Sequence, residues 1–84
     1  MRKVYKAGWC PLCRQGWIIV VKDIRASVLY LCCAECETQW ENPNRLKEGI
    51  CLPFNTYGKY EYPSENEIVK QKWLELLEGF YEKP

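Results

Sequence analysis

The strongest constraint on this chain is a Cys-x-x-Cys motif that occurs twice. The first copy spans residues 10–13, and the second spans residues 33–36 after 19 intervening residues. This spacing lies in the range of four-cysteine zinc sites. Four thiolates complete the tetrahedron around Zn²⁺, so such a site is structural and leaves no position for a substrate. The pattern therefore predicts one structural zinc ion, held by Cys10, Cys13, Cys33 and Cys36.

The length of the chain also favours a metal. Its 84 residues are expected to form a single domain, residues 1–84, near the lower end of the sizes that fold unaided. One core of this size rarely supplies more than about 3–5 kcal/mol. A structural zinc contributes about 10–16 kcal/mol at neutral pH. A hydrophobic content of 48%, with four Trp and six Tyr, predicts a folded chain.

The residues around the two motifs favour strands. Residues 17–21 are rich in β-branched side chains, and residues 28–32 read as the returning strand after a turn at residues 23–27. This hairpin would bring both cysteine pairs to one end. Residues 4–9 and 59–62 are further candidate strands, whereas Asn42, Pro43 and Asn44 predict a turn.

At this point the chain resembles a known class of metal site. Cys10-Pro11-Leu12-Cys13 with Cys33-Ala34-Glu35-Cys36 is similar to the two knuckles of a zinc ribbon, over about residues 5–40. The resemblance implies a structural zinc and a β-hairpin, and it implies no single function. Zinc-ribbon families often carry Gly directly after the second cysteine of a knuckle, where this chain has Arg14 and Glu37.

Three other uses of the cysteines remain open. Six cysteines could form disulfides, and paired cysteines could hold iron, as in rubredoxin. Residues 10–13 also resemble the Cys-Pro-x-Cys motif of glutaredoxins. In those redox proteins a helix follows the motif and lowers the thiol pKa, whereas Gly16 and a β-branched segment follow here.

Two cysteines are left outside the four. Cys32 could replace Cys33 as a ligand, but neighbouring strand residues point to opposite faces, so only one of them should reach the metal. We choose Cys33 because it repeats the spacing of the first pair. Cys32 and Cys51 are then predicted to be small buried hydrophobic residues.

The C-terminal segment predicts an amphipathic helix over about residues 65–79. Ser64 is the expected N-cap and Glu67 completes a capping box, while Gly79 is a plausible stop. The apolar side chains expected on one face of this helix are Val69, Trp73, Leu76, Leu77 and Phe80. The predicted fold class is therefore α+β: a zinc-ribbon β-hairpin, an additional β segment and a C-terminal amphipathic helix.

Composition argues against catalysis. The chain has no histidine, the commonest general acid and base, and no recognisable phosphate loop or nucleophile motif. It also shows no apolar run long enough for a signal peptide or a membrane span, which predicts a cytoplasmic protein. We therefore expect a non-catalytic module rather than an enzyme.

The expected partner is a protein of unknown identity. Tyr and Trp are favoured at interfaces, and the candidate anchors are Trp40, Tyr57, Tyr60 and Tyr62. A toxin-neutralising immunity protein or a regulatory adaptor, which covers the functional surface of its partner, is the form of this function that we expect.

Nucleic-acid binding, of the transcription or translation type, is the alternative. It rests on a net charge of +5 over residues 1–25, against −4 over residues 26–84. Cations interleaved with aromatic rings can grip phosphates and stack on bases. The candidate residues are Arg2, Lys3, Lys6, Arg14, Lys22 and Arg25.

Overall fold

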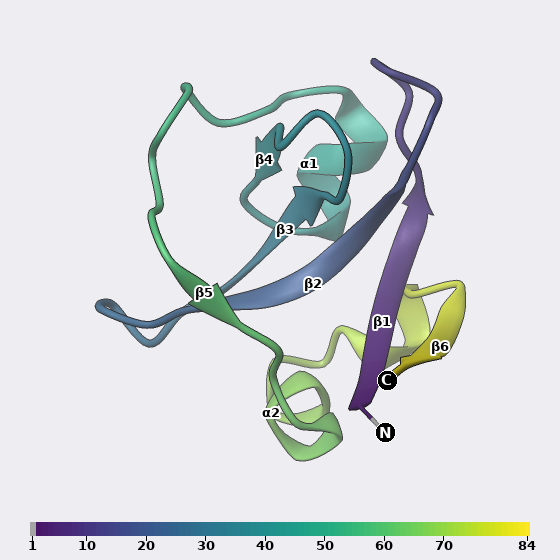
Figure 1. Cartoon of the computed structure of the whole chain (residues 1–84), viewed down its shortest axis with the longest axis vertical. Helices are drawn as coiled ribbons and strands as arrows, with labels where there is room; N and C mark the ends of the chain where they lie inside the picture. The colour runs from purple at the N-terminus through teal and green to yellow at the C-terminus, as the bar shows by residue number, and fades with distance from the viewer. Residues whose placement is uncertain (1) are drawn as a thin grey trace.

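The computed structural model describes residues 2–84 and is dominated by an antiparallel sheet of six strands (Figure 1). The strand order is β4-β3-β2-β1-β6, and β5 pairs with the end of β2 beyond the point where β1 leaves it. The strands are β1 (Arg2–Trp9), β2 (Trp17–Asp23), β3 (Leu29–Cys33), β4 (Gln39–Trp40), β5 (Tyr60–Glu61) and β6 (Gly79–Lys83), and the helices are α1 (Pro43–Glu48), α2 (Glu65–Lys70) and the short 3₁₀ helix η1 (Leu74–Leu76).

Strand β2 lies at the centre of the sheet and is buried on both sides. Its apolar residues 18–21 are at most 2% exposed. Ile18 and Val20 point into one hydrophobic cluster, while Ile19 and Val21 point into a second one on the opposite face. A strand covered on both faces needs no alternation of apolar and polar side chains, which explains the unbroken apolar run.

The two faces of the sheet are covered differently. On the first, which we call the helix-covered face, Leu46 of α1, Ile68 of α2, Trp73 and Leu77 pack against the sheet. The second, which we call the aromatic face, is covered by side chains of strands and of the segments on either side of β5, with no helix residue among them within residues 2–84. Its rings are Trp9, Trp17, Tyr30, Tyr57, Tyr60, Tyr62 and Tyr81.

The predicted hairpin forms as expected. Strands β2 and β3 pair from Ile18↔Cys33 to Lys22↔Leu29, and Asp23 organises the turn between them. Asp23 is only 4% exposed, and its side chain accepts a hydrogen bond of 2.7 Å from the backbone N–H of Ala26. Its carbonyl accepts another from Ser27. The buried carboxylate is therefore hydrogen-bonded and fixes the turn at residues 23–27.

The turn predicted at residues 42–44 is the beginning of helix α1. The Asn42 side chain accepts a hydrogen bond of 2.8 Å from the N–H of Arg45, and Pro43 occupies the first turn. Gly49 ends the helix with a φ of 76°. Asn at the N-cap and Pro at the first position are helix-start signals as well as turn signals, which explains the error.

The predicted C-terminal helix is wrong in length. Its start is correct, because Ser64 accepts a hydrogen bond from the N–H of Glu67. The helix ends at Lys70, Lys72 takes a left-handed φ of 61°, and the last residues form β6. β6 pairs with β1 over five residues, from Arg2↔Lys83 to Lys6↔Gly79.

The apolar face predicted for that helix is therefore divided. Trp73 and Leu77 pack on the core, as the helix model required, but Val69 is 48% exposed and Phe80 is 47% exposed. Ile68 takes the fully buried position of α2 instead. As a strand, β6 hydrogen-bonds the backbone groups along the free edge of β1. This stabilisation depends on residues distant in sequence, so the local pattern of the C-terminal segment does not predict it.

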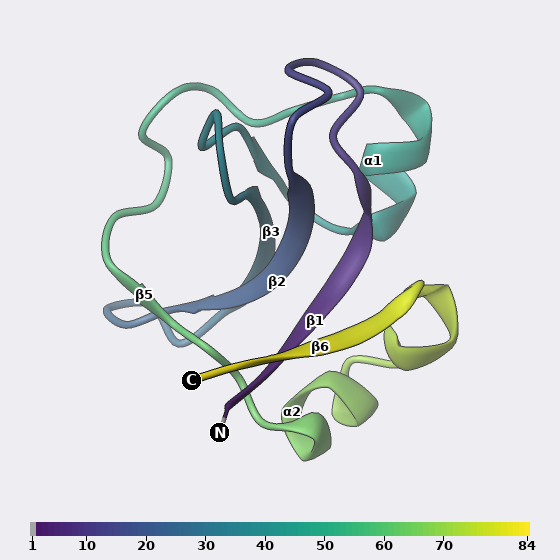
Figure 2. The ribbon, with the colours of Figure 1, turned by 45° about the vertical axis from the view of Figure 1, so that its right-hand side comes forward.

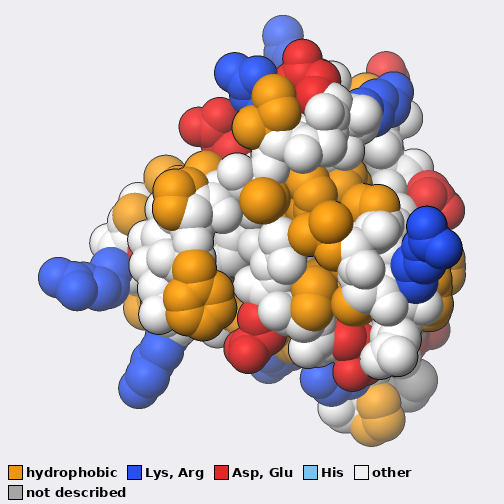
Figure 3. Space-filling model, turned by 90° about the horizontal axis from the view of Figure 1, so that it is seen from above, with side chains coloured by type: hydrophobic (Ala, Val, Ile, Leu, Met, Phe, Trp, Pro, Cys, Tyr) orange, Lys and Arg blue, Asp and Glu red, His pale blue; other side chains and the backbone are white. Residues whose placement is uncertain are grey.

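The molecule has two distinct ends along β1. The loops that carry the four cysteines lie at the top in Figures 1 and 2, the end that Figure 3 views from above, whereas the chain ends and α2 lie at the bottom. Within residues 2–84 no helix has both the length and the apolar character needed to cross a bilayer.

Candidate metal centre

The first cysteine loop follows β1. The backbone N–H of Cys10 donates to the carbonyl of Gly16 at 2.9 Å, and the N–H of Arg14 donates to the carbonyl of Cys10 at 3.1 Å. These bonds curl the chain so that Cys10 and Cys13 face the same point. In this turn Arg14 adopts a left-handed φ of 55°, a conformation that costs a non-glycine residue roughly 1 kcal/mol.

The second loop repeats the first. The N–H of Cys33 donates to the carbonyl of Thr38 at 2.9 Å, the N–H of Glu37 donates to the carbonyl of Cys33 at 3.1 Å, and Glu37 has a φ of 61°. The two loops therefore share the bond from the residue after the second cysteine to the carbonyl of the first, whereas the closing bond reaches Gly16 in one loop and Thr38, one residue earlier in the loop, in the other. Arg14 and Glu37 adopt the backbone conformation that Gly favours, which is why zinc ribbons often carry Gly there.

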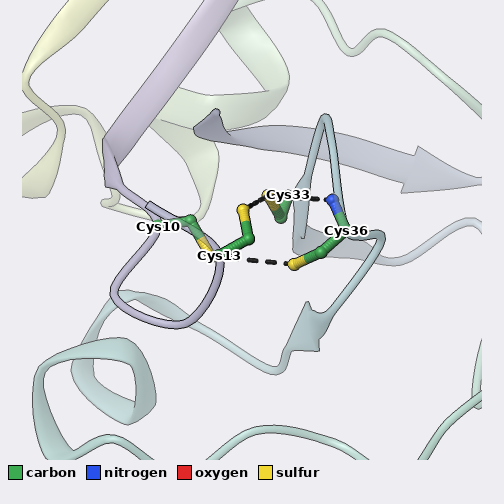
Figure 4. Close-up of side chains that lie close together, drawn as sticks. All are labelled: Cys10, Cys13, Cys33 and Cys36. Atoms are coloured by element: carbon green, nitrogen blue, oxygen red, sulfur yellow. Dashed lines mark hydrogen bonds between the residues drawn. The ribbon is translucent and has the colours of Figure 1, made fainter. Parts of the chain in front are cut away.

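The four thiols converge on one point (Figure 4). Their Sγ atoms all lie within 4.8 Å of one another. The Sγ atoms of Cys10 and Cys36 are 3.7 Å apart, and those of Cys13 and Cys33 are 3.6 Å apart. Four sulfurs at about 2.3 Å from a tetrahedral Zn²⁺ are separated by about 3.8 Å, so the donor set fits the ion.

The disulfide alternative does not match this arrangement. All six cysteines, which lie among the described residues, are free thiols. Bonded sulfurs are about 2.05 Å apart, far closer than any pair in the cluster. The arrangement fits a metal site, whose tetrahedral sulfur ligands suit zinc and iron alike.

The site is buried on one side and reaches the surface on the other. Cys10 and Cys33 are at most 1% exposed, Cys13 is half-buried and Cys36 is exposed. The backbone N–H groups of Glu35 and Cys36 each donate to the Sγ of Cys33 at 3.4 Å. Amide donors of this kind orient a ligand sulfur and offset part of its negative charge.

Two of the thiols differ in acidity. Burial raises the pKa of the Cys33 thiol. Burial opposes ionisation of Cys36 as well, but its hydrogen bonds with Thr38, whose hydroxyl lies at 3.2 Å, and with the Cys33 and Cys10 thiols together outweigh that effect and lower its pKa. A bound cation would hold both as thiolates, because metal binding displaces thiol protons.

Gly16 is a site residue that the sequence marked only as a break. It lies where the two cysteine loops meet, because a Cβ atom at this position would come within 2.4 Å of the Cγ of Glu35. The backbone N of Glu35 would lie 3.3 Å away. A glycine between two cysteine motifs is the only sequence signal for this contact.

The two remaining cysteines are separate from the cluster. Cys32 is buried on the aromatic face beside Tyr30, and burial raises its thiol pKa to about 11. The alternation of strand β3 thus directs Cys33 to the metal site and Cys32 away from it, as predicted. Cys51 is exposed, so the prediction that it is buried is wrong.

The candidate protein-binding residues fall into two groups. Trp40 is only 1% exposed and belongs to the core beneath the helix-covered face. Tyr57 stacks on Tyr30 with ring centroids 4.3 Å apart. Tyr60 and Tyr62 meet edge to face on the aromatic face, and Tyr60 is 39% exposed. Trp40 is therefore a core residue, whereas the three tyrosines lie on one face.

The six candidate nucleic-acid residues are also divided. Arg2 and Lys6 lie on the aromatic face, with the Arg2 guanidinium 5.5 Å from the ring centre of Tyr62 and the Lys6 ammonium 4.0 Å from that of Trp17. The other four lie elsewhere: Lys3 over Phe80, Lys22 in an ion pair of 3.2 Å with Glu67, Arg14 in the first cysteine loop and Arg25 in the β2–β3 turn.

Comparison with known proteins adds no assignment. The chain matches no protein-family model, no curated protein and no solved structure. What is established is a small antiparallel fold with four cysteines clustered at metal-binding distance, consistent with a zinc-ribbon-like site.

Proposed function

We propose that this protein is a non-catalytic binding module whose fold is stabilised by one zinc ion on Cys10, Cys13, Cys33 and Cys36. The observation that carries the proposal is the convergence of the four Sγ atoms at separations that a tetrahedral zinc requires. Four protein ligands fill the coordination sphere, so the ion would act on structure.

The position of the cluster explains why a metal would stabilise the whole fold. Cys10 follows β1, and Cys33 ends β3 on the far side of β2. A metal between them ties three neighbouring strands at one end of the sheet. The ion would supply most of the stability that a core of 84 residues lacks.

The partner is proposed at the level of class. A protein partner, with an immunity or adaptor role in the cytoplasm, stays a prediction, and the burial of Trp40 removes one of the four anchors on which it rested. The tyrosines on the aromatic face support binding by that face. The cations beside them favour the nucleic-acid alternative.

Metal content and metal removal test the structural proposal. Native mass spectrometry of the full chain is expected to show one zinc per protein. A chelator strong enough to remove it should abolish the cooperative thermal transition, and added zinc should restore it. One iron per chain would replace zinc in the proposal. A protein whose melting temperature does not change when its metal is removed would refute it.

A further inference from the structure

We propose that the aromatic face binds single-stranded nucleic acid, with exposed rings stacking on bases and cations beside them contacting phosphates. The inference deepens the proposed binding function and rests on it. It is carried by a juxtaposition: one face of the sheet, without helix cover in residues 2–84, gathers exposed aromatic rings and cations that have no carboxylate partner.

The cations stand along the β1–β6 side of this face. Arg2 and Lys83 are paired residues of neighbouring strands, and both approach the ring of Tyr62, at 5.5 Å and 5.6 Å from its centre. Lys6 lies farther along β1 and covers Trp17. Within the described residues none of the three forms a salt bridge, and the one side-chain hydrogen bond among them, from the Lys83 ammonium to the Tyr62 hydroxyl at 3.3 Å, leaves its charge unneutralised. Their charges are therefore available to a ligand.

The sequence alone did not point to Lys83. It lies in the acidic half of the chain, and only the pairing of β6 with β1 brings it beside Arg2. The two residues line a hollow on the surface together with Tyr62 and Pro84. A hollow with two cations on its rim suits a phosphate group.

The aromatic rings are exposed enough to receive bases. Trp9 is 50% exposed at the end of β1, and Tyr60 is 39% exposed. A second hollow on this face is lined by Phe54, Tyr57 and Tyr60. Phe54 is 85% exposed, more than any other large hydrophobic side chain in residues 2–84. The Phe54 ring therefore contributes little buried area to the core, whereas a base stacked on it would cover it.

The acidic side chains that the structure places at this face are Asp23 and Glu37. Asp23 is only 4% exposed, and its carboxylate accepts a hydrogen bond from the backbone N–H of Ala26. Glu37 and Lys59 both line the second hollow, so their charges offset one another. The cations at the β1–β6 side therefore set the sign of the face. Strand β1 spans about 26 Å at about 3.3 Å per residue, a length on the scale of the short sites of sheet-based single-strand binders, about 4 nucleotides at the lower end.

A single-stranded ligand fits these features better than a duplex. The rings and cations share one sheet face, and a base can stack on a ring only when it is not held in a pair. Stacking tolerates any base, so we expect modest sequence preference. The ligand class is therefore single-stranded DNA or RNA of low sequence specificity.

The test is fluorescence anisotropy of the zinc-loaded full chain with labelled 12-nucleotide oligo(dT) and oligo(U). Three phosphate contacts predict a slope of log K against log salt of about −2, or roughly 20-fold weaker binding at 200 mM than at 50 mM salt. F54A is expected to weaken binding about tenfold, which is within the range for loss of one stacked base. Y60A should act in the same direction.

The matched control for the rings is F80A. Phe80 is 47% exposed but contacts Tyr5, which belongs to the core of the helix-covered face, so its removal should leave oligonucleotide binding unchanged. For charge, K83Q is compared with K47Q in α1, because both remove one positive charge. K83Q should lower the salt slope by about 0.7, and K47Q should weaken binding by less than twofold.

The outcomes separate this inference from the metal proposal. Zinc content and melting temperature are measured on every variant, and the inference predicts that K83Q and F54A keep both. Failure of the folded, zinc-loaded protein to bind either oligonucleotide at 20 mM salt would overturn the nucleic-acid inference while leaving the zinc module standing. Equal binding of poly-glutamate would also overturn it, because a face that recognises charge alone needs no bases.

Discussion

Substitution of one cluster cysteine tests how much the metal contributes to the free energy of unfolding. Cys13→Ser removes one of the four proposed zinc ligands and is compared with Cys51→Ser, which makes the same atomic change at an exposed cysteine outside the cluster. Cys13 is half-buried and packs against the core. Because Cys→Ser replaces only the sulfur by an oxygen, the variant changes the metal site with little loss of packed volume.

The magnitude follows from the ligand count. A quarter of a zinc-binding free energy of about 10–16 kcal/mol is about 2.5–4 kcal/mol. At about 0.05–0.15 kcal/mol per residue, a chain of this length has a total stability of about 4–13 kcal/mol. Cys13→Ser should therefore lower the melting temperature by roughly 10–32 °C or leave the chain unfolded, at about 4–8 °C per kcal/mol. An exposed substitution such as Cys51→Ser should stay within about 0.5 kcal/mol.

The assay is thermal unfolding followed by circular dichroism with one equivalent of zinc present, repeated after addition of a chelator. The chelator should lower the wild-type transition, or abolish it, and should change Cys13→Ser less, because that variant has already lost part of the metal contribution. A Cys13→Ser protein that melts within a few degrees of Cys51→Ser, with and without chelator, would refute the reasoning.

Three further predictions address the loops and the core. Glu37→Gly should stabilise the zinc-loaded protein by up to about 1 kcal/mol in urea unfolding, because Gly adopts the φ of 61° without strain. Gly16→Ala should weaken zinc affinity in a competition titration with a chromogenic chelator, because its Cβ would press on Glu35 and separate the two loops; unchanged affinity would contradict the loop contact. Burial, with the 2.8 Å hydrogen bond and the nearby charge of Glu65, raises the pKa of Tyr5 to about 12. A raised folded-state pKa stabilises the fold fully below pH 10, and the contribution is lost as pH rises from 10 to 12, so Tyr5→Phe should flatten the alkaline fall in stability.

The parts of the structure that the sequence predicted are local ones. Each cysteine loop depends on a few consecutive residues, and the β2–β3 hairpin depends on a turn that Asp23 closes by itself. Strand alternation allowed only one of Cys32 and Cys33 to reach the metal, and the repeated Cys-x-x-Cys spacing selected Cys33. Features fixed within one segment can be inferred from that segment.

The parts that the sequence missed depend on distant pairing. Whether residues 79–83 continue a helix or form a strand is decided by the free edge of β1, more than 70 residues away. The same pairing places Lys83 beside Arg2. The burial of Trp40 follows from the short pairing of β4 with β3, which no local pattern announces. Nonlocal pairing overrode helix propensity here.

The most direct test of the central claim is zinc X-ray absorption spectroscopy of the purified full chain. The account predicts one zinc per protein with four sulfur neighbours at about 2.3 Å. Cys36→Ser should reduce the sulfur count to three, and Cys32→Ser should leave it at four, because Cys32 lies outside the cluster. A zinc shell with nitrogen or oxygen neighbours in the wild-type protein, or a sulfur count that falls in Cys32→Ser, would contradict it.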